Sequence, residues 1–574
     1  MKKILTILLL FASLTVGATK YYVTKTGNDG AEHTGLIGDP WLTLSYSCTR
    51  VTTAGDSIVI GAGTFDETVQ VVWDEEVSLI GVVGYPLTTI ITSSEALNPI
   101  ILGSSATQGT NGNQSISYIK MDGNDTTAYK AIAVSRRSNV KIHHCDFIDF
   151  YEYAVSFSGL GSGAGAPTTH STGNEFTNST ITNCGRDVWV TSYYSATSAL
   201  SIGGQDGMLV DGIMIDNVTG GRHSYGIKPN NEGFNENSTI TNNVINIHWR
   251  HSSGSFDFSI ETWNETGLEV GNNVMNGSCD LGGRWSAKVG SAGYGAWIHD
   301  NTIGPDVLGG AEASRGILLE ADCWNVVVER NHIKNVAEGI YINPMTTLPE
   351  DPEVNGRDYH VYDNVRISYN LLNNIGSLTS SSRGWGINMV GDGVYTHTMN
   401  DIYLLNNVII GDTDATSTMD GIMINGVGTI TDLRVRNNII LNFDYAYFYA
   451  QLGDIEQTID YLSIENNDAY GNGYSNVPRY GDGMIPGHNT TQNNITDDPL
   501  FISTSDFHLQ TTSPAKDEGL DVGLTSDYDG YLVPFNSVVD FGAYEFGSSF
   551  VPPKILIFNG KMVKINGKII MIEL

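Results

Sequence analysis

The sequence predicts an all-β solenoid, in which short strands stack in successive coils around one continuous core. An Asn recurs at intervals of 30, 28, 30, 39, 37, 31 and 29 residues, which are too short for separate domains. An apolar residue stands three positions before each mark and another two positions after it. The marks are Asn243, Asn273, Asn301, Asn331, Asn370, Asn407, Asn438 and Asn467. Stacking of these apolar positions would build the core of a coil repeat.

Other repeat classes do not fit this frame. The chain lacks the LxxLxL pattern of leucine-rich repeats and the 3.6-residue periodicity of helical repeats. A buried Asn at a coil corner can bond backbone groups of its own coil and of the adjacent coil. We therefore predict a structural role for the recurring Asn residues. The two long intervals place insertions at 345–358 and near 392–399.

The first 18 residues have the form of a secretory signal. Lys2 and Lys3 precede an apolar run from Ile4 to Leu14, and Val16-Gly17-Ala18 offers a small-residue cleavage site. No later stretch reaches the roughly 18 uninterrupted apolar residues that a membrane span needs. The sequence thus predicts a protein that is secreted or held at the cell surface, without a transmembrane segment.

Composition limits the partners. The 63 acidic and 30 basic residues give a net charge of -33, so nucleic acid is a poor partner because no basic footprint exists for phosphates. The five cysteines are scattered without a CxxC motif, which indicates buried core residues rather than a disulfide framework.

Two parts of the sequence, its opening and its repeated frame, resemble a known family. The opening YYVTKTGNDG, with GDPWLTL and GDSIVIGAGTFDE, precedes the repeated frame over about 115–480. Both resemble secreted right-handed parallel β-helix proteins of the pectate-lyase-like superfamily. The resemblance implies a right-handed parallel β-helix. Polysaccharide enzymes of this fold place their sites on a solvent-facing column of strand residues, so the resemblance also implies a site of that kind. The expected partner is an acidic polysaccharide.

The organisation expected along the chain has five parts. Asp497-Asp498-Pro499 and the stretch from Asp540 to Glu545 resemble the closing segment of such proteins, and two Asn-Gly-Lys steps near the end favour hairpins. The expected parts are a signal peptide at 1–18, a β cap with first coils at 19–95, β-helix repeats at 96–495, a capping segment at 496–548, and an appended β-ribbon at 549–574.

One strand pattern occurs four times, and the residue at its fourth position differs in chemical character between the copies. The four stretches are Tyr225-Gly226-Ile227-Lys228, Phe258-Ser259-Ile260-Glu261, Trp285-Ser286-Ala287-Lys288 and Arg315-Gly316-Ile317-Leu318. Because successive side chains of a strand face opposite sides, inward third residues leave the fourth residues facing out. We expect Lys228, Glu261 and Lys288 to form one exposed column.

This column suggests β-elimination on a uronate polymer. Such a lyase needs a base for the C5 proton and a cation for the adjacent carboxylate. Lys228 or Lys288 would be the base, while Arg284 or Arg315 would clamp the substrate carboxylate. Glu261 would orient a lysine or bind calcium, and no other cofactor is expected. Substrate contacts are expected from Trp263, Glu320, His223 and Asn343.

Three alternatives compete with the lyase. The column could be a ladder of opposite charges that stabilises neighbouring strands. Glu261 and Glu320, about 10 Å apart on next-but-one coils, could serve a hydrolase, although the NTDG and GHG motifs of polygalacturonases are absent, as is the RxPxxR stretch of pectate lyases. The chain could also be a glycan-binding adhesin or a tailspike-like protein. The sequence specifies no oligomeric state.

Overall fold

The computed structural model describes most of the chain between residue 18 and residue 572. The residues left out of the description are 1–17, 125–126, 160–166, 186–197, 218–224, 231–232, 248–257, 283–294, 306–314, 321, 344–360, 377–382, 391–396, 415–417, 426–427, 451–457, 475–478, 481–482, 485–488, 536–537, 548–553, 556, 559–560, 563, 566–567, 570 and 573–574. The predicted signal peptide and both predicted insertions therefore fall almost wholly outside the described residues.

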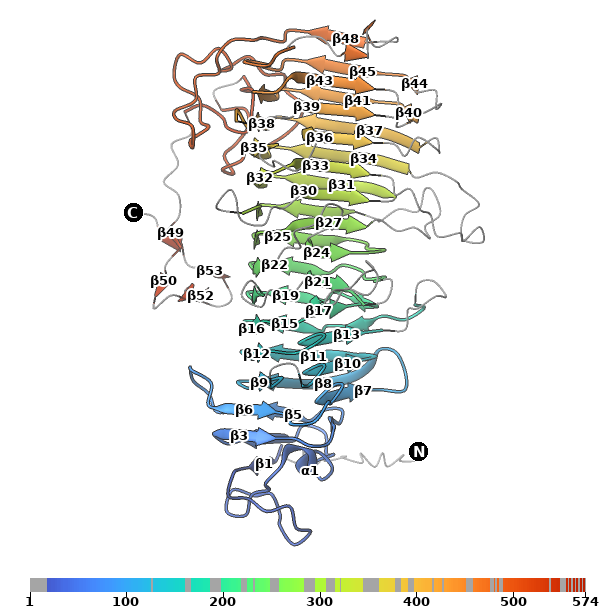
Figure 1. Cartoon of the computed structure of the whole chain (residues 1–574), viewed down its shortest axis with the longest axis vertical. Coiled ribbons are helices and arrows are strands. Elements are labelled where there is room, and N and C mark those ends of the chain that lie inside the picture. The colour runs from blue at the N-terminus through green and yellow to red at the C-terminus, as the bar shows by residue number, and fades with distance from the viewer. Residues whose placement is uncertain are drawn as a thin grey trace, which may run out of the picture.

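Three long sheets of parallel strands run the length of the molecule, so the fold is the predicted right-handed parallel β-helix (Figure 1). Each coil contributes one strand to each sheet, and parallel crossovers of this kind are right-handed in nearly all proteins. The single helix among the described residues, α1 (Leu44–Cys48), lies in the N-terminal part. No helix in the described part of the chain has the length and apolar character needed to span a bilayer.

The 15-stranded sheet carries the candidate site. Its strands are β4 (Val71–Val72), β7 (Ile101–Ser104), β10 (Ile132–Ser135), β13 (Val155–Ser158), β17 (Ser198–Ile202), β21 (Tyr225–Pro229), β24 (Phe258–Thr262), β27 (Ser278–Gly282), β30 (Arg315–Glu320), β33 (Glu338–Asn343), β36 (Arg383–Val390), β39 (Thr418–Asn425), β43 (Tyr445–Ala450), β46 (Arg479–Tyr480) and β47 (Gly483–Met484).

The 18-stranded sheet forms a second side of the solenoid. Its strands are β1 (Lys20–Val23), β2 (Ser57–Ile60), β5 (Ser78–Ile80), β8 (Thr110–Ser117), β11 (Arg137–His143), β15 (Glu175–Thr177), β19 (Leu209–Asp211), β22 (Thr239–Thr241), β25 (Leu268–Gly271), β28 (Ala296–His299), β31 (Cys323–Glu329), β34 (Val361–Ser368), β37 (His397–Leu405), β40 (Gly428–Ile430), β41 (Leu433–Arg436), β44 (Thr458–Ile459), β45 (Leu462–Glu465) and β48 (Asn489–Gln492).

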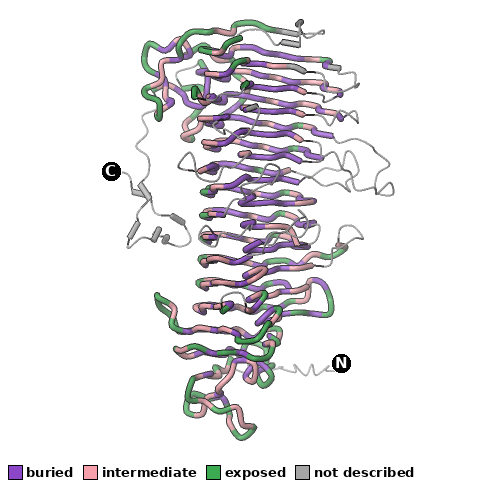
Figure 2. Tube along the Cα trace, viewed as in Figure 1, coloured by how far each residue is buried: buried purple, intermediate pink, exposed green. Residues whose placement is uncertain are grey.

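The 13-stranded sheet forms the third side. Its strands are β3 (Gly63–Asp66), β6 (Thr89–Thr92), β9 (Lys120–Asp122), β12 (Asp146–Ile148), β16 (Thr180–Thr182), β20 (Met214–Asp216), β23 (Val244–Asn246), β26 (Val274–Met275), β29 (Thr302–Ile303), β32 (His332–Val336), β35 (Leu371–Ile375), β38 (Val408–Gly411) and β42 (Ile439–Leu441). Inward aliphatic side chains of the three sheets form one continuous buried core, visible as the buried bands along the stacked strands in Figure 2.

A column of small residues lets the 15-stranded sheet pack closely on this core. A Cβ added at Gly316 would lie 2.4 Å from Cγ2 of Ile333 and 2.5 Å from the carbonyl oxygen of Gly339. Neither atom leaves room for a methyl group. The same place on other strands is filled by Gly226, Ser259, Gly339, Gly386, Gly421 and Ala446. The repeated small-apolar pair of the sequence is thus a packing requirement.

The recurring Asn residues form a buried hydrogen-bonded ladder, as predicted. Asn331 donates from Nδ2 to Oδ1 of Asn370 (3.0 Å) and to the carbonyl of Ile298 (2.9 Å), and its Oδ1 accepts from the backbone N–H of Asn301 (3.2 Å). The pattern repeats from Asn243 to Asn494. The ladder satisfies the backbone groups that each corner leaves unpaired, so its role is structural.

The segment after β48 packs along the side of the solenoid. Phe507, Leu509 and Phe541 lie against outward residues of β38 and β42, such as Val408 and Ile439. Farther on, short strands within 554–572, β49 (Lys554–Ile555), β50 (Ile557–Phe558), β51 (Lys561–Met562), β52 (Lys564–Ile565), β53 (Lys568–Ile569) and β54 (Met571–Ile572), pair in antiparallel fashion.

Candidate functional site

The structure places Lys228 beside Glu261, as the strand pattern predicts. Ile227 of β21 pairs with Ile260 of β24, so the residues after them are neighbours on the outer face. Nζ of Lys228 lies 3.7 Å from Oε2 of Glu261. This pair belongs to a column of outward residues that runs along the solenoid axis.

The third place in the column belongs to Asp280, so the prediction for Lys288 is wrong. Strand β27 pairs Cys279 with Ile260 and Asp280 with Glu261. The coil between these two strands is shorter than its neighbours, and the stretch Ser278–Gly282 provides the strand instead of 285–288. Lys288, Arg284 and His223 themselves lie outside the described residues.

The predicted exposure of the column is also wrong. Glu261 and Asp280 are each 1% exposed, and Glu320 is 4% exposed, although all three stand on the outward side of the sheet. An apolar cluster shares that outer face and explains part of this burial. Its members are Tyr225, Phe258, Leu318 and Tyr341, with Val390 packed against them.

Glu261 has a hydrogen-bond donor at one carboxylate oxygen and a cation near the other. The indole Nε1 of Trp263 donates to Oε1 of Glu261 at 2.9 Å, while the Lys228 ammonium lies next to Oε2. The ammonium also lies 4.7 Å from the ring centre of Tyr225. Trp263 thus orients a carboxylate, and its predicted stacking on a sugar stays a prediction.

Asp280 lies between the other two acids. Both of its carboxylate oxygens are buried without a hydrogen-bond partner in the described part of the chain. Glu320 stands on the next coil, but not directly beside Asp280. Asp280 pairs with Leu318, and Glu320 lies two residues farther along that strand, opposite Gly282. Side chains on this diagonal are about 7–8 Å apart at Cβ, against about 5 Å for Glu261 and Asp280.

Burial and mutual repulsion keep protons on this cluster. Burial, with the nearby carboxylates of Glu320 and Glu261, raises the pKa of Asp280 well above its usual range. Burial raises the pKa of Glu320 to about 7; Glu261 adds to this increase, and Arg315 and a hydrogen bond with Asn343 oppose it. The cluster therefore contains a carboxylic acid that titrates near neutral pH.

Arg315 forms the cationic edge of the cluster. Its Nε donates to Oε2 of Glu338 at 2.6 Å, and its guanidinium lies 4.4 Å from the ring centre of Tyr341. Burial lowers the pKa of Arg315, but the Glu338 carboxylate outweighs this effect and the net shift is upward. Asn343, predicted to contact substrate, pairs in register with Glu320 on the next coil.

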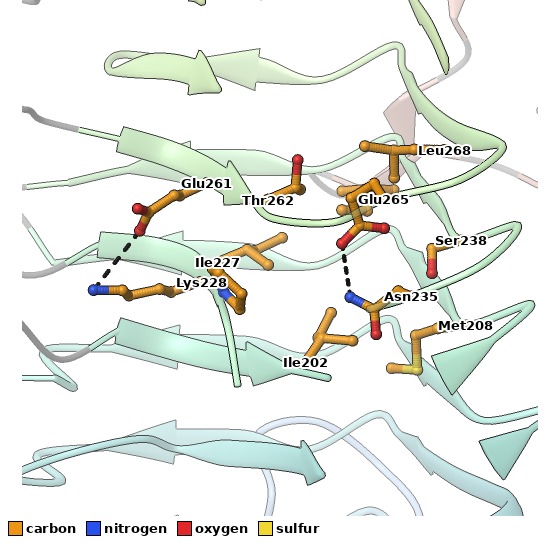
Figure 3. Close-up of a pocket in the computed structure, with 12 residues that line it drawn as sticks. Ile202, Met208, Ile227, Lys228, Asn235, Ser238, Glu261, Thr262, Glu265 and Leu268 are labelled. Carbon is orange, nitrogen blue, oxygen red and sulfur yellow. Dashed lines mark hydrogen bonds and ion pairs between the residues drawn. The ribbon is translucent and has the colours of Figure 1, made fainter. Parts of the chain in front are cut away.

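A small cleft, with room for about one water molecule, lies beside the Lys228–Glu261 pair (Figure 3). On its other side Nδ2 of Asn235 donates to Oε1 of Glu265 at 2.7 Å. Among the described residues, no group of three or more His, Cys, Asp or Glu side chains is arranged to hold a metal ion. Calcium at Glu261 stays a prediction.

Sequence reasoning missed Asp280, Glu338 and Tyr341. The alternation in Ser278-Cys279-Asp280-Leu281 was the available signal, since Cys279 and Leu281 are buried in the core while Asp280 faces out. Glu338-Gly339-Ile340 repeats the frame of Arg315-Gly316-Ile317 one coil later, and its register places Tyr341 beside Leu318.

Comparisons with known proteins match the fold at low sequence identity. No family model and no curated protein matches the chain. Solved structures that are similar include XylC in complex with xylose, at 12% identity over 91% of this chain and 98% of that one, with a TM-score of 0.35. The A-module of a mannuronan C-5 epimerase from Azotobacter vinelandii is 13% identical over 78% and 93%, with a TM-score of 0.32. A mutant of the periplasmic alginate epimerase AlgG is 9% identical over 80% and 84%, with a TM-score of 0.32.

Proposed function

We propose that this chain is a secreted, carbohydrate-active enzyme that hydrolyses glycosidic bonds of a polysaccharide. One observation carries the proposal: Glu261, Asp280 and Glu320 occupy adjacent coils, are buried, and two of them have a raised pKa. Glycoside hydrolysis requires a protonated carboxyl group for the leaving oxygen and an ionised one for water or for the sugar.

The charge balance favours hydrolysis over elimination. The cluster brings four acidic side chains, those of Glu261, Asp280, Glu320 and Glu338, against the two cations Lys228 and Arg315 among the described residues, so the charges balance when Asp280 and Glu320 keep their protons. Both cations lie next to carboxylates of the protein itself. A uronate carboxylate would have to displace one of these protein carboxylates or leave its own charge uncompensated, whereas a neutral glycan would not.

The geometry suggests a division of roles. Glu320, with a pKa of about 7, suits the general acid. Glu261, held by the Trp263 indole and the Lys228 ammonium, suits the base that activates water. These two residues stand on next-but-one coils and are offset by two residues along the strand, which puts them about 12 Å apart at the backbone. The long side chains can shorten this separation, so we assign them the wider spacing of inverting enzymes, which leaves room for a water. Asp280 lies between them, and the nearby Glu261 carboxylate adds to the raised pKa of Glu320.

A second candidate is β-elimination on an acidic polysaccharide. Lys228 lies at the rim of the cluster, with its side chain 13% exposed, and could remove a C5 proton. Arg315, at 17%, could then hold the uronate carboxylate if it exchanged Glu338 for substrate. Glu261 would be the residue to hold calcium, which would supply positive charge for the substrate carboxylate.

The products distinguish the two reactions. The purified protein is incubated with neutral glycans and with alginate, pectate, chondroitin and ulvan, with and without calcium, while reducing ends and absorbance near 235 nm are recorded. We expect reducing ends without absorbance, lost in Glu261→Gln and only reduced in Lys228→Ala, which removes the ammonium beside Glu261 but no reacting group. An absorbance increase that is lost in Lys228→Ala would refute hydrolysis and support elimination. Neither signal on any glycan would refute both and leave a binding protein of the adhesin or tailspike kind.

A further inference from the structure

A second cluster lies on the outer face of the 18-stranded sheet, around Trp297 of β28. The Trp297 side chain is 40% exposed, although most large apolar side chains of the central coils are buried. Its ring stacks on the imidazole of His299, with 3.5 Å between ring centres and 19° between planes. Its indole Nε1 donates to Oε1 of Glu329 on the next coil at 3.0 Å.

The residues beneath Trp297 are themselves fixed. Nδ1 of His299 lies 2.7 Å from Oδ2 of Asp300, and Nε2 lies 3.3 Å from Oε1 of Glu269. Arg330 donates to both oxygens of Asp300, from Nε and Nη2, at 3.0 Å each. His299 is 4% exposed. The exposed indole therefore rests on a buried, fully hydrogen-bonded support.

One glycine makes this support possible. A Cβ at Gly271 would lie 2.5 Å from Nε2 of His299, so any side chain at this place of β25 would displace the imidazole from its present position. Gly271 pairs in register with His299, and Glu269 pairs with Trp297. The face thus presents an indole with a half-exposed carboxylate directly beside it.

We propose that Trp297 is a stacking platform for a sugar ring of a neutral polysaccharide, separate from the carboxylate cluster. The apolar face of a pyranose packs on an aromatic ring, and a ring whose orientation is already fixed loses little entropy on binding. Glu269, with its side chain 37% exposed, offers acceptors for sugar hydroxyls. Around Trp297 the carboxylates of Glu269, Asp300 and Glu329 outnumber the guanidinium groups of Arg330 and Arg366 that pair with Asp300 and Glu329. The remaining negative charge would repel an acidic sugar, which commits the platform to a neutral one.

This inference does not rest on hydrolysis. The platform lies on the 18-stranded sheet, whereas Glu261, Asp280 and Glu320 lie on the 15-stranded sheet. Loss of the platform should weaken attachment to an insoluble polysaccharide and leave turnover of a short soluble substrate unchanged. The same variant would lose attachment even if the protein proved to be non-catalytic.

The test is a depletion assay with insoluble xylan, chitin and cellulose, and with calcium pectate gel as the acidic comparison. We expect wild type to bind at least one neutral polymer and Trp297→Ala to bind it about tenfold more weakly, which corresponds to roughly 1.4 kcal/mol. Trp297→Phe, which keeps a ring but loses the bond to Glu329, should fall between them. Binding to the pectate gel alone would overturn the proposal.

A matched control uses Tyr403, which stands three coils farther in the same column. Its ring packs against Arg434, at 5.4 Å, and against residues of the C-terminal segment. Tyr403→Ala should bind as wild type does. Unchanged binding in Trp297→Ala would contradict the platform. So would an equal loss of binding in Trp297→Ala and Tyr403→Ala when both variants keep the wild-type melting temperature.

Discussion

Removal of one amide from the Asn ladder should destabilise the solenoid strongly. In an Asn331→Ala variant the backbone N–H of Asn301 loses its acceptor and the carbonyl of Ile298 loses a donor. Both groups are in a fully buried corner, since Asn331 is 0% exposed. Each buried polar group left unpaired costs about 1–3 kcal/mol, so we expect a loss of about 2–6 kcal/mol.

The matched control is an exposed amide stack one coil away. Asn364 donates to Oδ1 of Asn325 at 2.8 Å on the surface, and its φ of 53° is one that glycine adopts freely. Asn364→Gly should cost less than about 1 kcal/mol. Urea unfolding gives the two free energies, and hydrogen exchange at the Asn301 amide localises the effect. Equal costs for the two variants would refute the reasoning.

Three further predictions concern packing and protonation. Gly316→Ala forces a methyl group against Ile333 and should lower stability by about 1–3 kcal/mol, whereas Gly295→Ala, whose added Cβ would have its nearest neighbour at 3.4 Å, should be tolerated in the same thermal melt. Burial raises the pKa of Asp468 to about 8; because the folded state holds this proton more tightly, stability should fall as pH rises from about 4 to 8, and the fall should be shallower in Asp468→Asn. If Glu320 is the general acid, activity should decline above a pH of about 7, as a rate profile would reveal.

The coil frame could be predicted because it follows from local rules. Inward Ile227, Ile260 and Ile317 and the Asn ladder repeat with constant chemistry, so periodicity alone places them. The pairing of Lys228 with Glu261 followed from the same rule. These features depend on the side of the strand on which a residue stands and little on distant contacts.

The third member of the column could not be placed in this way. The stretch 285–288 matches the small-apolar pattern better than 278–282 does, yet the register follows coil length, and Cys279 pairs with Ile260. The burial of Glu261 and Glu320 could not be predicted from the sequence either. It depends on Tyr225, Phe258 and Tyr341, which only the structure places on the same face. The pKa shifts depend on that burial.

The most direct measurement of the proposed chemistry compares wild type with Glu320→Gln on a polysaccharide that wild type cleaves. The substitution keeps size and hydrogen bonding but removes the proton that Glu320 would give to the leaving oxygen. We predict a loss of kcat/KM of about 10²- to 10⁴-fold, as measured by reducing ends, with an unchanged melting temperature. Equal rates for the two proteins would contradict a catalytic role for the carboxylate cluster.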